Sequence, residues 1–335
     1  MFSKIIGMEF SGIFSIRVLL AFLWIVAAMI SPTLLAQTYP QKAVRIIVPF
    51  PPGGGTDSMG RALAQKLSDA FGQAFLVENR GGAAGVIGTD AVAKAQPDGH
   101  TLLFTSSAFV ISAAVQNKLP YDPVTAFASV SYVAMTPNII FVHPSVPAKT
   151  VKELITFAKK RPGELNYGST GNGAPYHVAT EMFKQMADVN LTHVPYKGAG
   201  PALVAAISGE VSVLFGNIVS GLPHAKAGRL RALAITTTRR SPIAPELPTV
   251  EESGLKGYEF STWFGMLAPA GVSDGVITRL NQEIGSALKQ PDLRNRLLAD
   301  GAEPSGSTPA EFQKVIRLDM QRFAALAKAV NMKVD

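Results

Sequence analysis

Cysteine does not occur anywhere in the 335 residues of this sequence. Its absence excludes disulfide bridges, a thiolate nucleophile, a cysteine-ligated iron–sulfur cluster and a lipid anchor on cysteine. Charged residues are also scarce, at 16%, whereas 47% of the residues are hydrophobic. This is the composition of a folded chain rather than a disordered one, and the length is sufficient for two domains.

Several recognition motifs are missing as well. The 31 basic and 24 acidic residues give a formal net charge of +7, but Lys and Arg are scattered and form no cluster. We therefore expect no nucleic-acid partner. No loop fits the glycine motifs that bind ATP or NAD, and the five histidines include no pair with metal-ligand spacing, so no metal or cofactor is expected.

The first 36 residues differ from the rest of the chain. Lys4 and Arg17 precede an apolar run of 13 residues, 18–30, which is shorter than the roughly 20 residues that span a bilayer. A charged start, an apolar middle and a small residue at Ala36 are typical of a signal peptide. We expect cleavage near Ala36 and export of residues 37–335 to the periplasm, with an uncleaved membrane anchor as the alternative.

The remaining chain alternates short apolar runs with helical patterns. The pattern predicts strands at 44–50, 75–78, 101–105, 165–168, 191–196, 211–215, 230–236 and 258–267. It predicts helices near 59–71, 86–95, 150–161, 274–289 and 309–330, and three more that begin at Pro175, Pro201 and Pro223. Such alternation favours an α/β fold with parallel strands and right-handed crossovers.

Two such units joined by extended segments predict two lobes. We expect residues 37–138 and 255–335 to form lobe 1 and residues 139–254 to form lobe 2. The chain would cross between them twice, near 138–143 and near 249–257. One large doubly wound sheet is the alternative.

The most informative loop, 50–57, joins a predicted strand directly to a helix. Its three successive glycines leave the first backbone N–H groups of that helix uncovered by side chains. Because a helix N-terminus also carries a partial positive charge, this loop predicts an anion site formed by the main chain.

A second strand-to-helix loop, 167–175, has the same construction and adds the hydroxyls of Ser169 and Thr170. Since ligands of open α/β sheets bind at the carboxyl ends of the strands, we expect the two loops to face each other. Weaker candidates are Ser106 and Ser107 after the third predicted strand, residues 198–200 before Pro201, and Asn217 before Pro223. Tyr196 ends a predicted strand, and His177 lies in the first turn after the second loop. Phe50 and Tyr196 are candidates to pack on the apolar part of a ligand.

Ser169 also leaves an enzymatic interpretation open. Together with His177 or His193 and an acid it would make a hydrolase triad. The glycine two residues before the serine that a nucleophile elbow requires is absent.

Five motifs in order carry a resemblance to a known family: PFPPGGGTD (49–57), VENR (77–80), PDGHTLL (97–103), YGS (167–169) and HVPYKG (193–198). The sequence resembles the tripartite tricarboxylate transporter receptor family, also called the Bordetella uptake gene family. Departures from the usual pattern are Gly81, Ala84 and His100, in place of proline, glycine and tyrosine.

The resemblance implies a two-lobed periplasmic-binding-protein fold, type II-like, of the Venus flytrap kind, closing on a small carboxylate. It assigns Phe50, Gly54, Gly55, Thr56 and Asp57 to one side of the cleft and Ser169, Thr170 and Gly173 to the other. We expect Asp57, an acid beside an anion site, to cap the helix or to hold a water or an ammonium group.

The function expected from this resemblance is that of a monomeric receptor without catalytic residues, which delivers its ligand to membrane permease subunits. A ligand-sensing subunit that signals to a membrane kinase and an exported hydrolase are the alternatives. The sequence does not identify the carboxylate.

Overall fold

The computed structural model describes residues 39–116 and 118–330. The predicted signal peptide, residues 1–36, lies outside these ranges. The chain divides into two compact units, 1–41 and 42–335, and the second unit is described here by itself. Within the described ranges, no helix combines the length and hydropathy that crossing a membrane requires.

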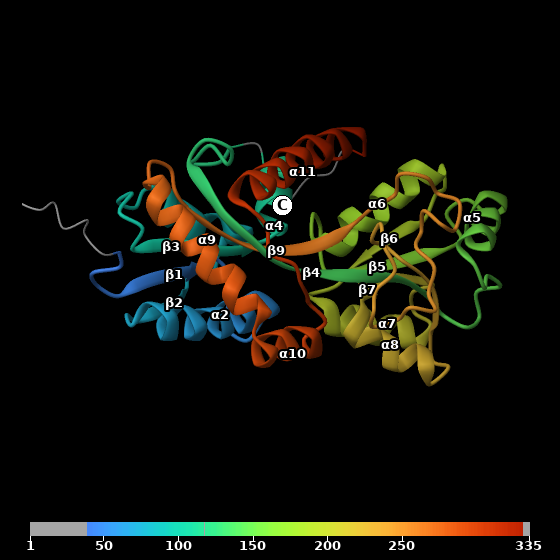
Figure 1. Ribbon diagram of the computed structural model, residues 1–335. Coiled ribbons are helices and arrows are strands. Elements are labelled where there is room, and N and C mark those ends of the chain that lie inside the picture. Colours follow the sequence, from blue (N-terminus) through green and yellow to red (C-terminus); the bar gives the residue numbers. More distant parts are fainter. Residues whose placement is uncertain (1–38, 117, 331–335) are drawn as a thin grey trace, which may run out of the picture. The chain divides into compact units, whose positions relative to one another are not determined.

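Strands and helices alternate along the second unit (Figure 1). The strands are β1 Val44–Val48, β2 Phe75–Asn79, β3 Thr101–Ser106, β4 Phe127–Val142, β5 Asn166–Ser169, β6 Thr192–Pro195, β7 Val213–Asn217, β8 Arg231–Ile235, β9 Ser261–Pro269 and β10 Glu303–Pro304. The helices are α2 Gly55–Phe71, α3 Val86–Ala93, α4 Ala108–Val115, α5 Val151–Lys160, α6 Pro175–Ala187, α7 Ala199–Ser208, α8 Ile218–Lys226, α9 Asp274–Lys289, α10 Pro291–Ala299 and α11 Pro309–Ala329, with a 3-10 turn, η1, at Ala83–Gly85.

One long strand, β4, belongs to both halves of this unit. Strand pairing runs in the order β2-β1-β3-β9-β4-β7-β5-β6, and β8 and β10 also pair with β4. β4 pairs with β9 as far as Pro137 and with β7 from Asn138 onward. We call the strands on the β9 side, with their helices, lobe 1, and those on the β7 side lobe 2.

Two connections join the lobes. The first is β4 itself. The second follows β8: Thr249 still lies beside Ile235 of β8, and the chain next enters the sheet of lobe 1 at Ser261. The predicted α/β fold with two lobes and two crossovers is confirmed, and the lobes share a strand instead of forming one doubly wound sheet.

Helices cover both faces of each sheet. In lobe 1, α4 and α11 lie on one face and α2, α9 and α10 on the other (Figure 1). In lobe 2, α5 and α6 pack into one hydrophobic cluster, and α7 and α8 into a second cluster on the opposite face. This arrangement leaves the ends of the strands, rather than their faces, open for a site.

Several local predictions differ from the structure. Helix α7 begins at Ala199, two residues before the predicted Pro201, and α10 was not predicted. Only the end of β4 was predicted, as the extended segment 138–143, because Pro137 and the Ser and Thr residues before it are not typical of a buried strand. The strand accommodates Pro137 because β4 changes its pairing partner there. Helix α4 was missed because it is buried and its AFVISAAV sequence has no polar face. Pro223 lies inside α8 instead of beginning it, because Asn217 caps the helix by accepting the N–H of Val219 at 2.7 Å.

Gly265 of β9 offers a test of the core of lobe 1. A Cβ at this position would overlap the ring of Phe312, which is fully buried and packs edge-on against Trp263 with ring centroids 5.2 Å apart. We expect Gly265→Ala to lower the free energy of unfolding by about 1–3 kcal/mol through overpacking, as measured by urea denaturation. Gly285→Ala is the control, since nothing lies within 4 Å of a Cβ there. Equal midpoints for the two variants would contradict this packing.

Candidate functional site

The carboxyl ends of the parallel strands of the two lobes point toward each other. β3 is antiparallel to β9, β9 to β4, and β4 to β7. Because β4 runs from lobe 1 into lobe 2, β3 runs toward lobe 2 and β7 toward lobe 1. β1 and β2 share the direction of β3, and β5 and β6 share that of β7. The loops after these strands therefore lie at the junction of the lobes, where α/β folds bind ligands.

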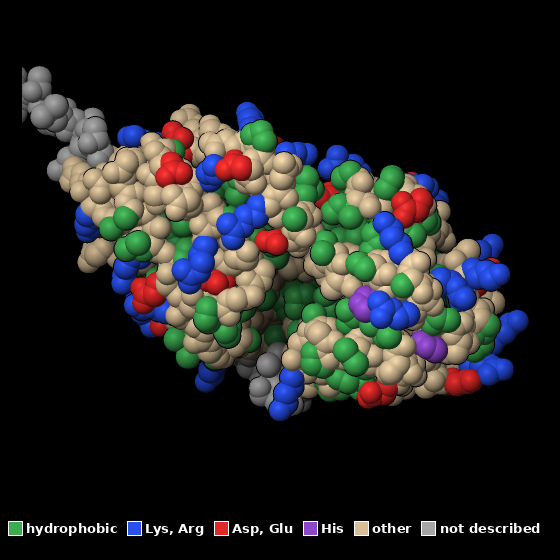
Figure 2. Space-filling view, turned by 90° about the horizontal axis from the view of Figure 1, so that it is seen from below, with side chains coloured by type: hydrophobic (Ala, Val, Ile, Leu, Met, Phe, Trp, Pro, Cys, Tyr) green, Lys and Arg blue, Asp and Glu red, His purple; other side chains and the backbone are tan. Residues whose placement is uncertain are grey.

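The strand register gives the offset between the strand ends of the two lobes, measured along β4. On the lobe 1 side, Ser106 at the end of β3 pairs with Phe264 of β9, and Phe264 pairs with Ala134 of β4. On the lobe 2 side, Asn217 at the end of β7 pairs with Asn138 of β4. Ala134 and Asn138 are four residues apart, which is about 13 Å along β4 at roughly 3.3 Å per residue. Figure 2 shows a hollow between the lobes with hydrophobic side chains on its floor.

The first loop ends at the N-terminus of α2, where Gly54 is the N-cap and Gly55 the first helical residue. Within the part of the chain that the structure describes, the N–H groups of Gly55, Thr56 and Asp57 have no protein acceptor. The Thr56 side chain is buried against the protein, so these donors are the groups that the loop presents. Unpaired N–H groups and the helix dipole together favour an anion here.

Two glycines of the first loop are not required by the backbone. Gly53 has a φ of +85°, which favours glycine, but Gly54 has a φ of −81°. A Cβ on Gly54 would meet only the Pro51 carbonyl oxygen, at 3.9 Å, and one on Gly55 only the end of Met59, at 3.7 Å. Both positions have room for a side chain, and its absence leaves the N–H groups of the helix accessible.

Asp57 holds the first loop in place. Its Oδ2 accepts the N–H of Gly53 at 2.9 Å, and its Oδ1 accepts Arg61 Nε at 3.0 Å and Asn79 Nδ2 at 2.9 Å. Burial acts to raise the pKa of Asp57, but these hydrogen bonds outweigh it and hold the pKa below its ordinary value. The contact with Gly53 resembles the reach-back half of a capping box. The carboxylate is therefore ionised and fully engaged by the protein.

Phe50 and the turn η1 support the same loop. The Phe50 carbonyl accepts Asn79 Nδ2 at 3.1 Å, and its half-buried ring lies 3.5 Å from where a Cβ on Gly85 would be. Ala83 and Ala84 have φ values of +47° and +53°, a conformation uncommon for residues other than glycine. Ala84 is one of the departures from the family pattern, so this chain keeps the left-handed turn without glycine.

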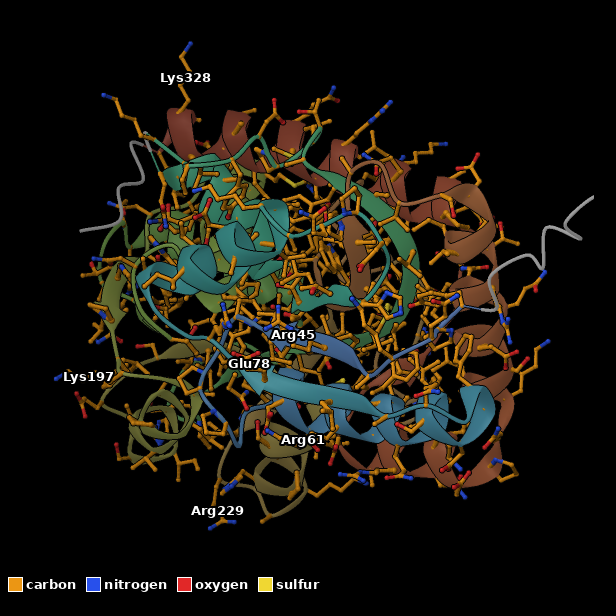
Figure 3. All side chains as sticks on the ribbon, turned by 90° about the vertical axis from the view of Figure 1, so that its left-hand side faces the viewer. Arg45, Arg61, Glu78, Lys197, Arg229 and Lys328 are labelled. Atoms are coloured by element: carbon orange, nitrogen blue, oxygen red, sulfur yellow. The ribbon has the colours of Figure 1, made fainter. Side chains whose placement is uncertain are left out.

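Two arginines of lobe 1 that Figure 3 labels, Arg45 and Arg61, are engaged by acids. Arg45 forms an ion pair with Glu78 at 3.6 Å, and Arg61 forms one with Asp57 at 3.0 Å. Lys197 of lobe 2 projects outward at the edge of the molecule (Figure 3). The site therefore offers main-chain donors more readily than cationic side chains.

The second loop joins β5 to α6. The N–H of Gly173 donates inward to His177 Nδ1 at 2.9 Å, so this amide is occupied by the protein. The N–H groups of Thr170 and Asn172 have no acceptor among the described residues. Thr170 is half-buried and Asn172 is exposed, and these two residues provide the open donors of the loop.

Ser169 is enclosed by the second loop. It has no exposed surface, its Oγ contacts His193 Nε2 at 2.6 Å, and it accepts the N–H of Gly171 at 3.1 Å. A nucleophile must reach its substrate. This hydroxyl instead organises the loop, so the geometry gives little support to a hydrolase.

A buried polar group of residues, which we call the histidine cluster, lies beneath the second loop. Its members are Tyr167, Ser169, His177, Glu181, Lys184 and His193. The rings of His177 and His193 stack with centroids 4.1 Å apart and an interplanar angle of 5°. Burial lowers the pKa of His177 to about 4, with His193 and Lys184 acting in the same direction and Glu181 against it, and burial also lowers the pKa of His193. Both imidazoles are thus neutral at pH 7.

The weaker candidates lie at other strand ends. Ser106 Oγ accepts the N–H of Ala108 at 3.4 Å, and Asn217 caps α8 while donating its own N–H to the Tyr176 hydroxyl at 2.8 Å. The Tyr196 hydroxyl is turned to Glu210, at 2.7 Å. The junction therefore receives Ser106 and Asn217, while the hydroxyl of Tyr196 is committed to a surface acid.

Two polar residues of this region, Asn138 and Glu181, were not among the predicted site residues, whereas Ser107 was one of the weaker candidates. Ser107 Oγ and Asn138 Nδ2 are buried and have no partner within the described ranges; they lie next to the end of β3 and at the change of partner in β4. The signal for Asn138 is a single amide between a proline and an apolar run. Glu181 follows His177 by four residues, a spacing that places both on one face of α6.

Comparisons with known proteins give a family match. The chain matches the model of the tripartite tricarboxylate transporter family receptor over residues 59–332. It is 37% identical over 314 residues to Protein BugT of Bordetella pertussis strain Tohama I, a match that covers 93% of this chain and 96% of BugT.

Two solved structures are similar over nearly the whole of their own chains. R. palustris Rpa4515 with adipate is 36% identical with a TM-score of 0.74, covering 88% of this chain and 99% of that one. MatC from Rhodopseudomonas palustris with bound malate is 29% identical with a TM-score of 0.70, covering 86% of this chain and 99% of that one. These likenesses confirm the predicted fold class.

We expect Asp57→Asn to lower the free energy of unfolding at pH 7 by about 1–3 kcal/mol, because it removes the charge from three hydrogen bonds that fix the first loop. Since the pKa of Asp57 is lowered in the folded state, this stabilisation is present above about pH 4 and is lost as the pH falls further. Urea denaturation at pH 7 and pH 3 measures both effects.

Asp188→Asn is the control for this measurement, because the Asp188 side chain is 97% exposed and its 3.6 Å ion pair with Lys159 lies on the surface. It should leave the unfolding midpoint nearly unchanged. A difference between wild type and Asp57→Asn that is as large at pH 3 as at pH 7 would contradict the assignment.

Proposed function

The chain belongs to the tripartite tricarboxylate transporter receptor family, and on this premise we propose that it is an extracytoplasmic solute receptor whose two lobes close on a small carboxylate. The loaded receptor delivers its ligand to the membrane permease subunits of a tripartite transporter. We further propose that it is exported with its signal peptide removed near Ala36, acts as a monomer, and has lobe boundaries at 138/139 and 254/255.

The observation that carries this proposal is the bare N-terminus of α2. Gly54 and Gly55 lack side chains at positions where the backbone does not require glycine, and the N–H groups behind them have no protein acceptor among the described residues. An anion bound there would satisfy these donors without a cationic side chain.

The opposing loop supplies the second half of the site. We call the first loop, residues 50–57, the first jaw, and the second loop, residues 167–175, the second jaw. A carboxylate that contacts both jaws binds the closed state better than the open state, and this difference in affinity is sufficient to drive closure. Proposed ligand contacts are Phe50, Gly54, Gly55, Thr56, Ser106, Thr170, Tyr196 and Asn217, while Asp57, Ser169, Gly173 and His177 hold the jaws in shape.

Adipate and malate are the first ligands to test, because the two similar structures contain them. The mature chain, residues 37–335, is melted against these two acids and a wider panel of carboxylates. A ligand at about 100 times its Kd adds roughly 2.7 kcal/mol of stability, which raises the melting temperature by several degrees. Unchanged melting temperatures throughout the panel would argue against the receptor function.

Replacement of Gly55 tests the first jaw directly. We expect Gly55→Val to abolish the ligand-induced shift and the heat of binding in calorimetry, because the new side chain covers the N–H groups of α2. The urea midpoint should change little, since the position has room. Gly275→Val is the matched control, in the first turn of α9 with nothing within 4 Å of its Cβ. Retained affinity in folded Gly55→Val would remove the first jaw from the site.

A further inference from the structure

We infer that His177 is a positioning residue of the second jaw: its Nδ1 holds the N–H of Gly173 inside the protein and so determines which N–H groups of the jaw face the ligand. The inference rests on the proposed function, because the second jaw is a ligand-binding loop only in a carboxylate receptor. It assigns His177 a role beneath the site instead of a contact with the ligand.

The geometry turns part of the second jaw away from the cleft. The hydrogen bond from Gly173 N to His177 Nδ1 is 2.9 Å long and buried, and Gly173 has the positive φ, +67°, that this turn requires. The next N–H, of Ala174, donates to the Gly171 carbonyl at 3.2 Å. With these two donors used internally, the N–H groups of Thr170 and Asn172, which have no acceptor among the described residues, are the ones left for a ligand.

This bond requires a particular protonation state. Nδ1 accepts a hydrogen bond, so His177 is assigned as the neutral tautomer that carries its proton on Nε2. A proton on Nδ1 would place two N–H groups against each other and release Gly173.

The groups that face the ring come from three elements. His193 of β6 stacks on it at 4.1 Å, Glu181 of α6 lies 4.0 Å from Nε2 with Lys184 bonded to that carboxylate, and Tyr167 of β5 donates its hydroxyl to the same carboxylate at 2.6 Å. Burial outweighs the attraction of Glu181, so the pKa of His177 falls to about 4. The jaw is therefore intact at neutral pH and loses its Gly173 anchor as the pH falls through about 4.

Two substitutions test the hydrogen-bond acceptor and the aromatic ring of His177 separately. His177→Asn keeps an oxygen acceptor close to the position of Nδ1 but cannot titrate, whereas His177→Phe keeps an aromatic ring to stack on His193 but has no acceptor. With adipate and malate as probes, we expect affinity at pH 7.5 within about twofold of wild type for His177→Asn, and about 10-fold weaker for His177→Phe. His143→Asn, which alters a histidine bonded to Ser145, should bind as wild type does.

The pH profile distinguishes positioning from mere packing. Because carboxylate ligands also titrate near pH 4, the readout is the ratio of wild-type to His177→Asn affinity at each pH from 7.5 to 3.5. We expect this ratio to stay constant down to about pH 5 and then to fall severalfold as wild type loses the anchor. A constant ratio over the whole range, or Asn and Phe variants that bind equally, would overturn the inference.

A measurement without ligand keeps the inference independent of the proposed function. In the free mature protein, hydrogen exchange of the Gly173 amide should be slow in wild type and His177→Asn and fast in His177→Phe, and ¹⁵N NMR should show an unprotonated Nδ1 at pH 7. Equal exchange in all three proteins would refute the role of His177. Wild type that binds neither acid while showing the expected exchange pattern would count against the receptor function alone.

Discussion

A helix cannot pair the N–H groups of its own first turn, and at α2 the protein does not pair them either. The N–H groups of Gly55, Thr56 and Asp57 have no acceptor in the described part of the chain. The nearest acid, Asp57, is unavailable because its oxygens already bind Gly53, Arg61 and Asn79. These N–H groups and the positive end of the helix dipole are therefore free to bind an anion from outside the protein. Because β1 ends at the junction of the lobes, the N-terminus of α2 lies there too.

The second constraint is the sharing of β4. Since β4 pairs with β9 in one lobe and with β7 in the other, the carboxyl ends of β3 and β7 point toward each other, about 13 Å apart along the shared strand. The two jaws are thus placed by sheet topology, while their fine conformation is set by buried side chains: Asp57 under the first jaw and the histidine cluster under the second. Main-chain donors act at the surface of the site, and titratable side chains act behind it.

Much of this arrangement could be predicted from the sequence. The glycines of residues 53–55 after an apolar strand signalled an open helix N-terminus, and the alternation of strands and helices predicted two α/β lobes. Long-range pairing was not readable: nothing local indicates that residues 127–142 form one strand serving both lobes, or that His193 stacks on His177. The inward direction of the Gly173 N–H was equally hidden, because it depends on which rotamer the buried imidazole adopts.

Pro137 lies where β4 passes from one lobe to the other. A proline has no N–H, so the ladder has no donated bond to break at this residue when the strand bends. The bonds beside it are a different matter, because the N–H of Asn138 donates to Thr236 Oγ1 at 3.1 Å and its carbonyl accepts the N–H of Thr236 at 2.9 Å. Under the proposed function, Pro137 is the point at which we expect the main chain to bend when a solute binds and when it is released.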